Sequence, residues 1–388
     1  MIDTTKYFPL IWAALSRKPA RLALTFTSVV IAFILYGVTI GINAGFQNLI
    51  DAARLDRIHV SGNHAGPLML AQRDQIGKLD NVSDVGIFDR VVGYHQNPKN
   101  TIAVLMMDRA MRNVFPDLPV SQQQWTNLYS VRDGVIFSQM MAERYDIDVG
   151  DKFPVVTQQP TRSDGSNLWT FEVVSIVDDI PLYPIGFAIG NYDFLDRARS
   201  LTESGKVGQF WVLAKDSAQV DELGEMIDQS FANSPHPTKS NSEKAIFESI
   251  GGSDSEVALG ATMLAGAGIL MIIVLTTNAI AQSVRERMHE FAVMKTLGFT
   301  DTGVVVLVFA EAAAPCLLGC VTGLALAKAL SVLLPHLLPS GVGFPMPYVS
   351  SSVLVSAIGA AVAVAFISSV VPASRIARLE VAVALSRR

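Results

Sequence analysis

Four stretches of the chain carry almost no charge and are long enough to cross a membrane. They are residues 22–50, 257–284, 302–327 and 329–374. A membrane-spanning helix needs about 20 mostly apolar residues, so the first three stretches each allow one span. Four prolines and two glycines at 335–348 interrupt the fourth stretch, because these residues break a continuous helix. Only about 350–371 is then left for a separate span.

Roughly 205 residues of polar sequence separate the first span from the second. Several short runs in it are typical of strands, namely TIAVLMM, KFPVV, TFEVVSIV and QFWVLA, and two others, SQMMAERYDI and QVDELGEMIDQSF, are typical of helices. We therefore predict an α+β domain. It should have two lobes, because the helical 217–232 returns after a Pro- and Gly-rich segment at 181–190. The predicted fold is a membrane protein with four transmembrane α-helices, one before and three after a large extracytoplasmic α+β domain.

The pattern divides the chain into nine segments. The first half comprises a cytoplasmic amphipathic elbow at 1–21, a first transmembrane helix at 22–46 with an outward stalk to about 58, and a periplasmic α+β domain at 59–244. A return stalk and second transmembrane helix follow at 245–284, then a cytoplasmic loop at 285–301 and a third transmembrane helix at 302–334. The chain ends with a short periplasmic loop at 335–349, a fourth transmembrane helix at 350–372 and a cytoplasmic tail at 373–388.

Basic residues indicate which side of the membrane each end occupies. They cluster before the first span (Lys6, Arg17, Lys18, Arg21), between the second and third (Arg285, Arg287, Lys295) and after the fourth (Arg375, Arg378, Arg387, Arg388). Loops rich in Lys and Arg stay in the cytoplasm. With four spans all three clusters fall on one side, so both termini are predicted to be cytoplasmic and the α+β domain periplasmic.

Composition and charge support this division. The chain is 50% hydrophobic and only 17% charged, which is too apolar for an ordinary soluble protein. Residues 47–256 contain 18 basic and 29 acidic residues, whereas the rest of the chain contains 12 and 6. Because the basic groups gather beside the spans and not on a folded domain, nucleic-acid binding is not expected.

A cleavable signal peptide is the rival interpretation of the first apolar stretch. Such a peptide has an apolar core of about 7 to 15 residues followed by a small-x-small cleavage site. Here the core is much longer and no A-x-A triplet follows it. We therefore expect the first span to be retained.

Glycines repeat every four residues in two of the spans. Gly37, Gly41 and Gly45 share one face of the first span, and Gly319 and Gly323 share a face of the third. Helices can approach closely where a face lacks side chains. These glycines are therefore predicted to pack transmembrane helices together, either within one chain or between two.

The loop between the second and third spans is short and strongly polar. Its sequence, SVRERMHEFAVMKTLGFT, suits a helix that continues from the second span and ends at Leu297, with Gly298 at the C′ position and Thr300 or Asp301 capping the next helix. Charged residues are scattered around this helix and not confined to one face. That mixture fits a protein-docking surface better than a membrane-lying one, and a merely solvated turn is the alternative.

Part of this loop resembles the cytoplasmic loop of FtsX/MacB-like ABC transporter permeases. In ERMHEFAVMKTLGFT the matching residues are Glu286, Arg287, Glu290, Lys295 and Gly298. FAEAAAPCLLGCVTG resembles the third span of the family, including its acid, here Glu311, and PASRIARLEVAVALSRR resembles its tail, although Val381 stands where proline is usual. GVIFSQMMAERYDIDVGDKFPV is similar to a stretch of the family's outer domain.

The resemblance implies a permease of the mechanotransmission class (type VII). Such a chain works as a homodimer, or as a heterodimer with a sister permease, and each copy docks on a separate cytoplasmic ABC ATPase. By this resemblance, Glu286, Arg287, Glu290, Phe291, Lys295 and Gly298 couple the chain to the ATPase. This sequence has no Walker A loop, since both Gly-Lys pairs lack the following Ser or Thr. It should therefore be a non-enzymatic subunit without a cofactor of its own, while ATP and Mg²⁺ bind the partner.

Glu311 is the one acid within the apolar part of the third span. An intramembrane carboxylate is a candidate proton or gating site. No basic residue of the spans is close to it in sequence, and a structural hydrogen bond is the favoured interpretation. The outer domain has no G-x-S-x-G or H-E-x-x-H motif, and its histidines have no metal-site spacing.

Two functions remain for a protein of this kind in the bacterial inner membrane. The first is ATP-driven export or extraction of a lipid-linked, peptide or drug-like substrate from the periplasm or outer leaflet, with a periplasmic adaptor and an outer-membrane channel as further candidate partners. The second is regulation of a periplasmic cell-wall hydrolase without transport. The large outer domain favours export, because the regulators are expected to have a domain of about half that size.

Overall fold

The structure is a computed structural model that describes residues 19–63, 66–180, 186–252, 255–337 and 347–377. Most of the predicted elbow at 1–21, most of the loop at 335–349 and most of the tail at 373–388 lie outside these residues. The chain divides into two compact units. The helix unit comprises 1–45, 253–333 and 346–388, and the sheet unit comprises 46–252 and 334–345.

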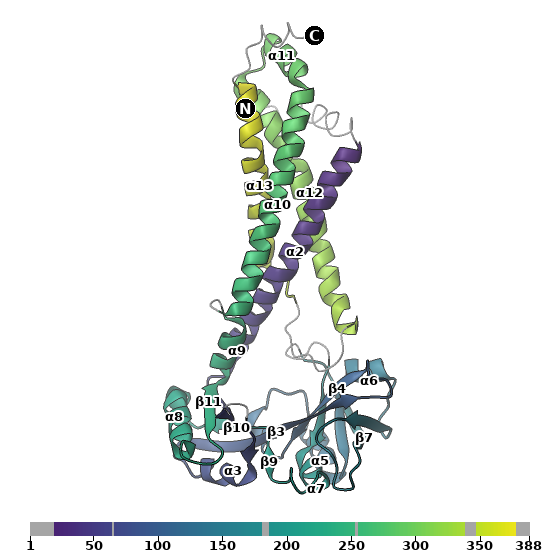
Figure 1. The fold of residues 1–388 in the computed structure, drawn as a ribbon, viewed down its shortest axis with the longest axis vertical. Coiled ribbons are helices and arrows are strands. Elements are labelled where there is room, and N and C mark those ends of the chain that lie inside the picture. Colours follow the sequence, from purple (N-terminus) through teal and green to yellow (C-terminus); the bar gives the residue numbers. More distant parts are fainter. Residues whose placement is uncertain (1–18, 64–65, 181–185, 253–254, 338–346, 378–388) are drawn as a thin grey trace. The chain divides into compact units, whose positions relative to one another are not determined.

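Among its described residues, the helix unit contains one helix that precedes the sheet unit in sequence and four that follow it (Figure 1). They are α2 (Pro19–Ala52), α10 (Glu256–Glu286), α11 (Met288–Thr296), α12 (Asp301–Leu337) and α13 (Ser351–Ala377), and the last turns of α2 belong to the sheet unit. Within the described residues, four segments are long and apolar enough to cross a membrane: Leu22–Ala52, Ala258–Glu286, Asp301–Leu333 and Ser351–Ser374. This confirms the predicted arrangement of one span before and three after an α+β domain.

Glycines bring α2 and α12 into close contact. A Cβ added at Gly319 would lie 2.6 Å from Val29 Cγ1, and one at Gly323 would lie 2.8 Å from Phe33 Cβ. Gly37 approaches α12 in the same way, with its added Cβ 2.9 Å from an alanine side chain. The backbones can come this close only because the glycines lack side chains.

Gly41, the second glycine of the α2 repeat, has different neighbours. The Tyr348 N–H donates to Gly41 O at 2.8 Å, and a Cβ at Gly41 would lie 3.3 Å from Pro347. Gly41 therefore contacts the segment before α13 and not α12. Gly45 is buried. The four-residue repeat thus serves more than one contact within the chain.

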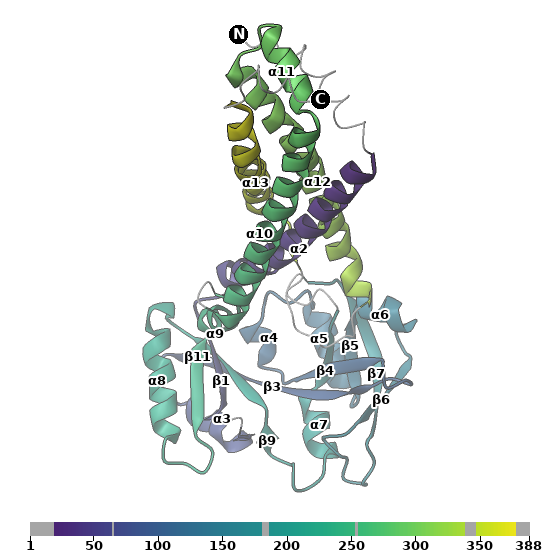
Figure 2. The same cartoon turned by 45° about the horizontal axis from the view of Figure 1, so that its top comes forward.

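The second and fourth apolar helices pack along each other. α10 and α13 run side by side in both views (Figures 1 and 2). Their contact is supported by one polar bond, from Ser368 Oγ to Ile273 O at 3.3 Å. The apolar core of the helix unit includes Phe33, Cys316 and Phe291, so helices α2 and α12 and the short α11 all contribute to it.

The sheet unit is built on a mixed sheet of nine strands, in the order β11-β1-β10-β3-β4-β8-β5-β7-β6. These strands are β1 (Arg57–Gly62), β3 (Val82–Tyr94), β4 (Thr101–Met107), β5 (Gly134–Ser138), β6 (Lys152–Thr157), β7 (Leu168–Val177), β8 (Ala188–Asn191), β10 (Gln209–Ala214) and β11 (Thr238–Ser242). A separate pair is formed by β2 (Leu68–Met69) and β9 (Lys206–Val207). The β4–β8 and β5–β7 pairs are parallel, and the other pairs are antiparallel.

Strand β3 joins the two ends of this sheet. Its first half, Val82–Phe88, pairs with β10, and its second half, Phe88–Tyr94, pairs with β4. One strand of 13 residues therefore belongs to both ends. The prediction of two lobes stays a prediction, since the sheet itself is continuous across this strand.

Helices cover the sheet unit and separate its strands along the chain. They are α3 (Leu70–Ile76), α4 (Met111–Val114), α5 (Gln122–Ser130), α6 (Gln139–Tyr145), α7 (Tyr192–Ala198), a 3-10 turn η3 (Ser217–Gln219), α8 (Val220–Phe231) and α9 (Glu243–Gly251). Figure 2 shows α8 beside β11 and β1, whereas α5 lies by β5 and β7. The runs predicted as helical coincide with α6 and α8.

The strands form where apolar residues alternate with polar ones. In β7, Trp169, Phe171 and Val173 are buried, while the residues between them are partly exposed. A strand sends successive side chains to opposite faces, so this alternation places three large side chains in one core. The predicted run TFEVVSIV lies within β7, and TIAVLMM, KFPVV and QFWVLA fall on β4, β6 and β10.

Candidate functional site

The loop after α10 folds as a short helix with a break before it. α10 ends at Glu286, and Arg287, with φ −107° and ψ 14°, separates it from α11. The expectation of one helix continuing to Leu297 is therefore corrected. The break coincides with the inward ion pair of the Arg287 side chain, and α11 then places Phe291 fully inside the apolar core.

Gly298 ends α11 as the sequence pattern predicts. Its φ is +95°, in the left-handed region that favours glycine. Gly298 N–H donates to Lys295 O and Phe299 N–H donates to Met294 O, both at 3.1 Å, which is the bond pattern of a Schellman motif. Thr300 Oγ1 then accepts from the Gly303 N–H at 3.1 Å and caps the start of α12. The chain reverses sharply at this point.

Glu311 is paired with a residue of the loop. Arg287 Nη1 donates to Glu311 Oε2 at 2.7 Å, and Ser283 Oγ donates to Glu311 Oε1 at 2.7 Å. Both carboxylate oxygens thus accept a hydrogen bond, and the Arg287 and Glu311 side chains are each only 12% exposed. This geometry agrees with a structural role for Glu311. Sequence reasoning missed the partner because it looked for one within the spans, and Arg287 lies 24 residues away at the helix break.

Lys295 attaches the other end of α11 to the bundle. Its Nζ donates to Ile376 O in α13 at 2.9 Å and lies 2.8 Å from Asp301 Oδ1 at the start of α12. The Lys295 side chain is 8% exposed. Between the two anchors, the Arg287 guanidinium lies over the Phe291 ring at 5.1 Å. α11 is therefore held against the bundle at both ends and in the middle.

The residues predicted to couple to an ATPase separate into two groups. Arg287, Phe291 and Lys295 face the protein's own bundle and position α11. Glu286 and Gly298 are exposed, and Glu290 is partly exposed while accepting from Arg287 Nε at 3.1 Å.

Two exposed apolar residues of this loop were missed by the sequence reasoning. Leu297 is 75% exposed and Val293 is 39% exposed. His289 is exposed beside them in the sequence. The sequence could have indicated the exposure of Leu297, because this residue stands directly before the C′ glycine and therefore lies at the end of a helix. Few neighbouring residues cover a side chain at such an end. Four exposed residues in and beside α11 are here called the outer face of α11: His289 and Val293 within it, Leu297 directly after it and Glu286 at the end of α10.

A second charged cluster lies within the sheet unit, at the start of β1 and the start of α9. Arg57, at the start of β1, is 2% exposed, with Nε 2.6 Å from Glu243 Oε2 and Nη2 3.2 Å from Asp117 Oδ2. Glu243, the first residue of α9, also accepts from the Arg54 N–H at 3.3 Å. The Arg57 guanidinium stacks over the Phe115 ring at 4.2 Å. We call these residues the stalk cluster.

The stalk cluster ties together segments that are far apart in the chain. Arg57 follows α2 by a few residues, whereas Glu243 begins α9, which leads back to α10. Burial raises the pKa of Glu243, and the nearby Arg57 charge opposes that shift. Nearby, a Cβ at Gly251 would lie 1.9 Å from the Phe46 ring, so α9 and the end of α2 touch directly. Sequence reasoning had no signal for a pair separated by 186 positions.

Metal chemistry has no evident site in the part of the chain that the structure describes. There, no three His, Cys, Asp or Glu side chains come together in a way that could hold a metal ion.

The fold and the sequence motifs define a class of protein. Four apolar helices, one before and three after a large α+β domain, are each long enough to cross a membrane, which indicates a multi-pass membrane protein. Residues 262–381 match the family described as FtsX-like permease C-terminal, and this range contains most of α10 and all of α11, α12 and α13. The C-terminal part of the chain thus carries an FtsX-like permease domain, as its loop and tail motifs predict.

Three solved structures resemble part of the chain at low sequence identity. The extracellular domain of the noncanonic ABC-type transporter YknZ from Gram-positive bacteria has 12% identity, a TM-score of 0.35, and coverage of 48% of this chain and 99% of its own. The periplasmic region of MacB from Actinobacillus actinomycetemcomitans has 11% identity, a TM-score of 0.38, and coverage of 53% and 97%. A permease domain from Porphyromonas gingivalis has 10% identity, a TM-score of 0.29, and coverage of 48% and 90%. No curated protein matches the sequence significantly.

Proposed function

We propose that this chain converts ATP hydrolysis by a separate cytoplasmic ATPase into movement of its extracytoplasmic domain. The observation that carries the proposal is the outer face of α11. This short helix is anchored to α12 and α13 by Arg287 and Lys295, yet it leaves Leu297 75% exposed. An anchored helix with an exposed apolar residue suits docking, because a partner can push on it without displacing it from the bundle.

Charge and apolar contact have different roles in this docking. Buried apolar side chains supply most of the free energy of a protein interface, and the polar rim supplies orientation. Leu297 and Val293 would fill a pocket of the ATPase, while Glu286 would meet a basic group beside it. ATP and Mg²⁺ bind the ATPase and not this chain.

In this proposal the stalk cluster transmits the movement of the membrane spans to the outer domain. Arg57 and Glu243 join the segment after the first span to the segment before the second, both within the sheet unit. A change in the separation of these two spans would act on the pair directly. The buried ion pair resists such separation, so the sheet unit would move as a body.

Orientation and partners complete the proposal. Both termini and α11 lie in the cytoplasm of a bacterial inner-membrane protein, the sheet unit lies in the periplasm, and a second copy of the permease or a sister permease completes the transporter. Intact cells can test the orientation, since a cysteine at His289 should resist an impermeant maleimide while one at Ser163 reacts. The reverse labelling pattern would contradict the proposed orientation.

The substrate class we propose is lipid-linked, peptide or drug-like, taken from the periplasm or outer leaflet and passed toward an adaptor and an outer-membrane channel. Deleting the gene should then make cells retain such molecules and leave peptidoglycan turnover unchanged. A change in peptidoglycan turnover without altered retention would instead favour control of a cell-wall hydrolase.

Docking is tested by co-purification of the ATPase with charged variants of exposed leucines. Leu297→Asp should weaken association at least tenfold and remove stimulation of ATP hydrolysis in nanodiscs. Leu201→Asp is the matched control, because Leu201 is 92% exposed but lies in the sheet unit, and it should behave as the wild type. Wild-type association of Leu297→Asp would mean that the ATPase docks elsewhere.

A further inference from the structure

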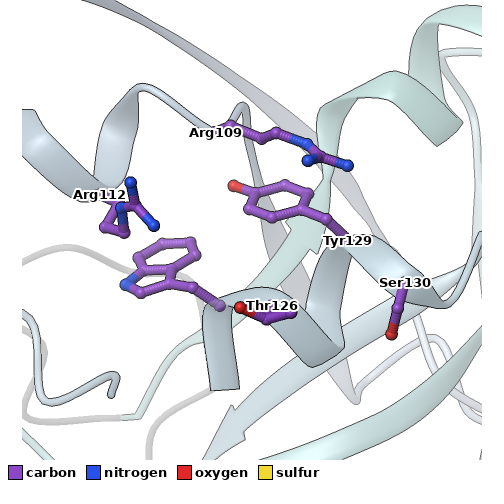
Figure 3. Close-up of a pocket in the computed structure, with 6 residues that line it drawn as sticks. Arg109, Arg112, Thr126, Tyr129 and Ser130 are labelled. Atoms are coloured by element: carbon purple, nitrogen blue, oxygen red, sulfur yellow. The ribbon is translucent and has the colours of Figure 1, made fainter. Parts of the chain in front are cut away.

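A small pocket lies between α4 and α5 of the sheet unit. Its volume is about 280 Å³, and it is lined by Arg109, Arg112, Trp125, Thr126, Tyr129 and Ser130. Figure 3 shows the Arg109 guanidinium lying over the Tyr129 ring, with Arg112 on the neighbouring helix. None of these residues takes part in the outer face of α11 or in the stalk cluster.

The aromatic wall of the pocket is rigid. The Trp125 and Tyr129 rings stack with centroids 6.0 Å apart and an interplanar angle of 9°. Tyr129 Oη donates to Asp108 O at 2.6 Å, which fixes its ring, and the Arg109 Cζ lies 5.2 Å from the Tyr129 centroid. Trp125 is only 3% exposed. A ligand would therefore meet a preformed surface.

No carboxylate of the described residues neutralises the two arginines. Both are exposed, and within the described residues neither has an ion pair or a hydrogen bond to a carboxylate. The neighbouring Asp108 is already engaged, because Arg73 Nη2 lies 3.0 Å from its Oδ2 and the Ile87 N–H donates to its Oδ1 at 3.0 Å. Two unpaired guanidinium groups at one pocket are notable here, since residues 47–256 are acidic overall.

Hydrogen-bond directions around the pocket favour an acceptor as ligand. The hydroxyls of Thr126 and Ser130 donate to backbone carbonyls of their own helix, at 2.9 and 2.8 Å. The indole Nε1–H of the almost fully buried Trp125 has no acceptor among the described residues. The uncommitted groups are thus N–H donors, and guanidinium groups bind phosphate through paired hydrogen bonds.

We propose that this pocket binds a phosphate group carried by a small molecule or by a lipid headgroup. Its volume lies below the roughly 300 to 1,000 Å³ of sites that enclose a drug-sized molecule, so it suits a headgroup and not a whole drug. Arg109 and Arg112 hold the phosphate, and the Trp125 indole N–H adds a third donor. The site is independent of the proposed docking of α11, so either can fail without the other.

Calorimetric titration of the full-length protein in phosphatidylcholine nanodiscs tests the site. The probes are inorganic phosphate and dihexanoyl phosphatidic acid below its micelle concentration. Arg109→Gln with Arg112→Gln should weaken binding of both probes at least tenfold. Arg132→Gln removes an exposed arginine that follows α5 but does not line the pocket, and it should bind as the wild type.

The two probes distinguish the source of the phosphate. Similar affinity for both, lost in the double variant, supports a soluble phosphate ligand, whereas much tighter binding of phosphatidic acid supports a lipid headgroup. Trp125→Phe keeps an aromatic wall and should weaken phosphate binding by removing the indole donor. The proposal is overturned if the wild type binds neither probe at millimolar concentration, or if the double variant binds both as tightly as the wild type.

Discussion

The Arg287 guanidinium and the Glu311 carboxylate form an ion pair, with Nη1 2.7 Å from Oε2, that joins the break after α10 to the first third of α12. Each side chain is 12% exposed, so the two charges are largely removed from solvent. A charge within a membrane protein is costly unless a partner compensates it. The pair therefore neutralises Glu311 in place and at the same time sets the position of α11.

Replacing only one residue of this pair should lower stability more than replacing both residues. Glu311→Leu leaves Arg287 without its main partner and should lower stability by roughly 3 kcal/mol, because a buried charge left unpaired is strongly unfavourable. Replacing both residues, Arg287→Met with Glu311→Leu, should recover much of that loss, since an apolar pair of similar volume avoids the desolvation cost. Thermal unfolding in nanodiscs measures the difference.

Glu286→Gln serves as the control for that comparison, because Glu286 is exposed beside the pair and should change stability little. A double variant as unstable as Glu311→Leu would show that the ion pair is not what Glu311 contributes. It would favour the proton-site interpretation of Glu311.

The left-handed backbone of Gly298 leads to a second prediction. A Cβ at Gly298 would meet no atom within 4 Å, so any cost of Gly298→Ala comes from its φ of +95° and not from crowding. Left-handed backbone costs an ordinary residue roughly 1 to 2 kcal/mol. Thermal unfolding should show that loss, and the proposed stimulation of the ATPase should fall as α11 loses its end.

Gly359→Ala is the matched control for Gly298→Ala. Gly359 also has open space around its Cβ position, but it lies inside α13 without a positive φ. Alanine is favoured over glycine in helices by roughly 1 kcal/mol, so this variant should be neutral or slightly stabilising. Equal destabilisation of both variants would contradict the backbone argument.

Local pattern predicted much of this fold. The four spans follow from runs without charge, β7 follows from its alternation of buried and exposed residues, and Gly298 follows from its place after a helical run. Each of these depends on neighbours in sequence, because spans, strands and caps are set by periods of a few residues.

Long-range pairs could not be predicted in this way. The Arg287 partner of Glu311 depends on a helix break that propensity does not show, and the Arg57–Glu243 pair depends on how the sheet brings β1 beside β11. The exposure of Leu297 was missed because an apolar residue in a helical run is normally expected inside. These features depend on tertiary packing, which decides which face of a helix or strand other segments cover. A single sequence does not show that packing.

Contact between α2 and α12 supplies a third prediction. A Cβ at Gly319 would lie 2.6 Å from Val29 Cγ1, so Gly319→Ala must push the helices apart and should destabilise the helix unit by roughly 1 to 3 kcal/mol. Gly266→Ala in α10 is the control, because its Cβ would meet nothing within 4 Å. Thermal unfolding of the two variants decides the matter, and similar melting temperatures would mean that the α2–α12 contact is not tight.

The last prediction concerns the Arg57–Glu243 pair of the stalk cluster, because loss of the arginine and loss of the acid should have different effects on stability. Burial raises the pKa of Glu243 despite the attraction of Arg57, so in the folded protein desolvation outweighs the ion pair. A carboxyl group with a raised folded pKa gives most stability below its unfolded pKa of about 4.3, and that contribution is lost as pH rises through the folded pKa. Glu243→Gln, which mimics the protonated acid and leaves Arg57 Nη2 3.2 Å from Asp117 Oδ2, should therefore cost less at pH 7 than the loss of Arg57 and should lack this pH-dependent loss. Arg57→Met should instead cost roughly 3 to 5 kcal/mol at pH 7, because it leaves a buried carboxylate unpaired, and its loss with rising pH should be steeper than in the wild type. Urea unfolding between pH 4 and 7, followed by the fluorescence of Trp125, Trp169 and Trp211 in the sheet unit, measures each variant against the wild type. If Glu243→Gln proves the more damaging change at pH 7, attraction outweighs desolvation and the cluster is held by its charge pair after all.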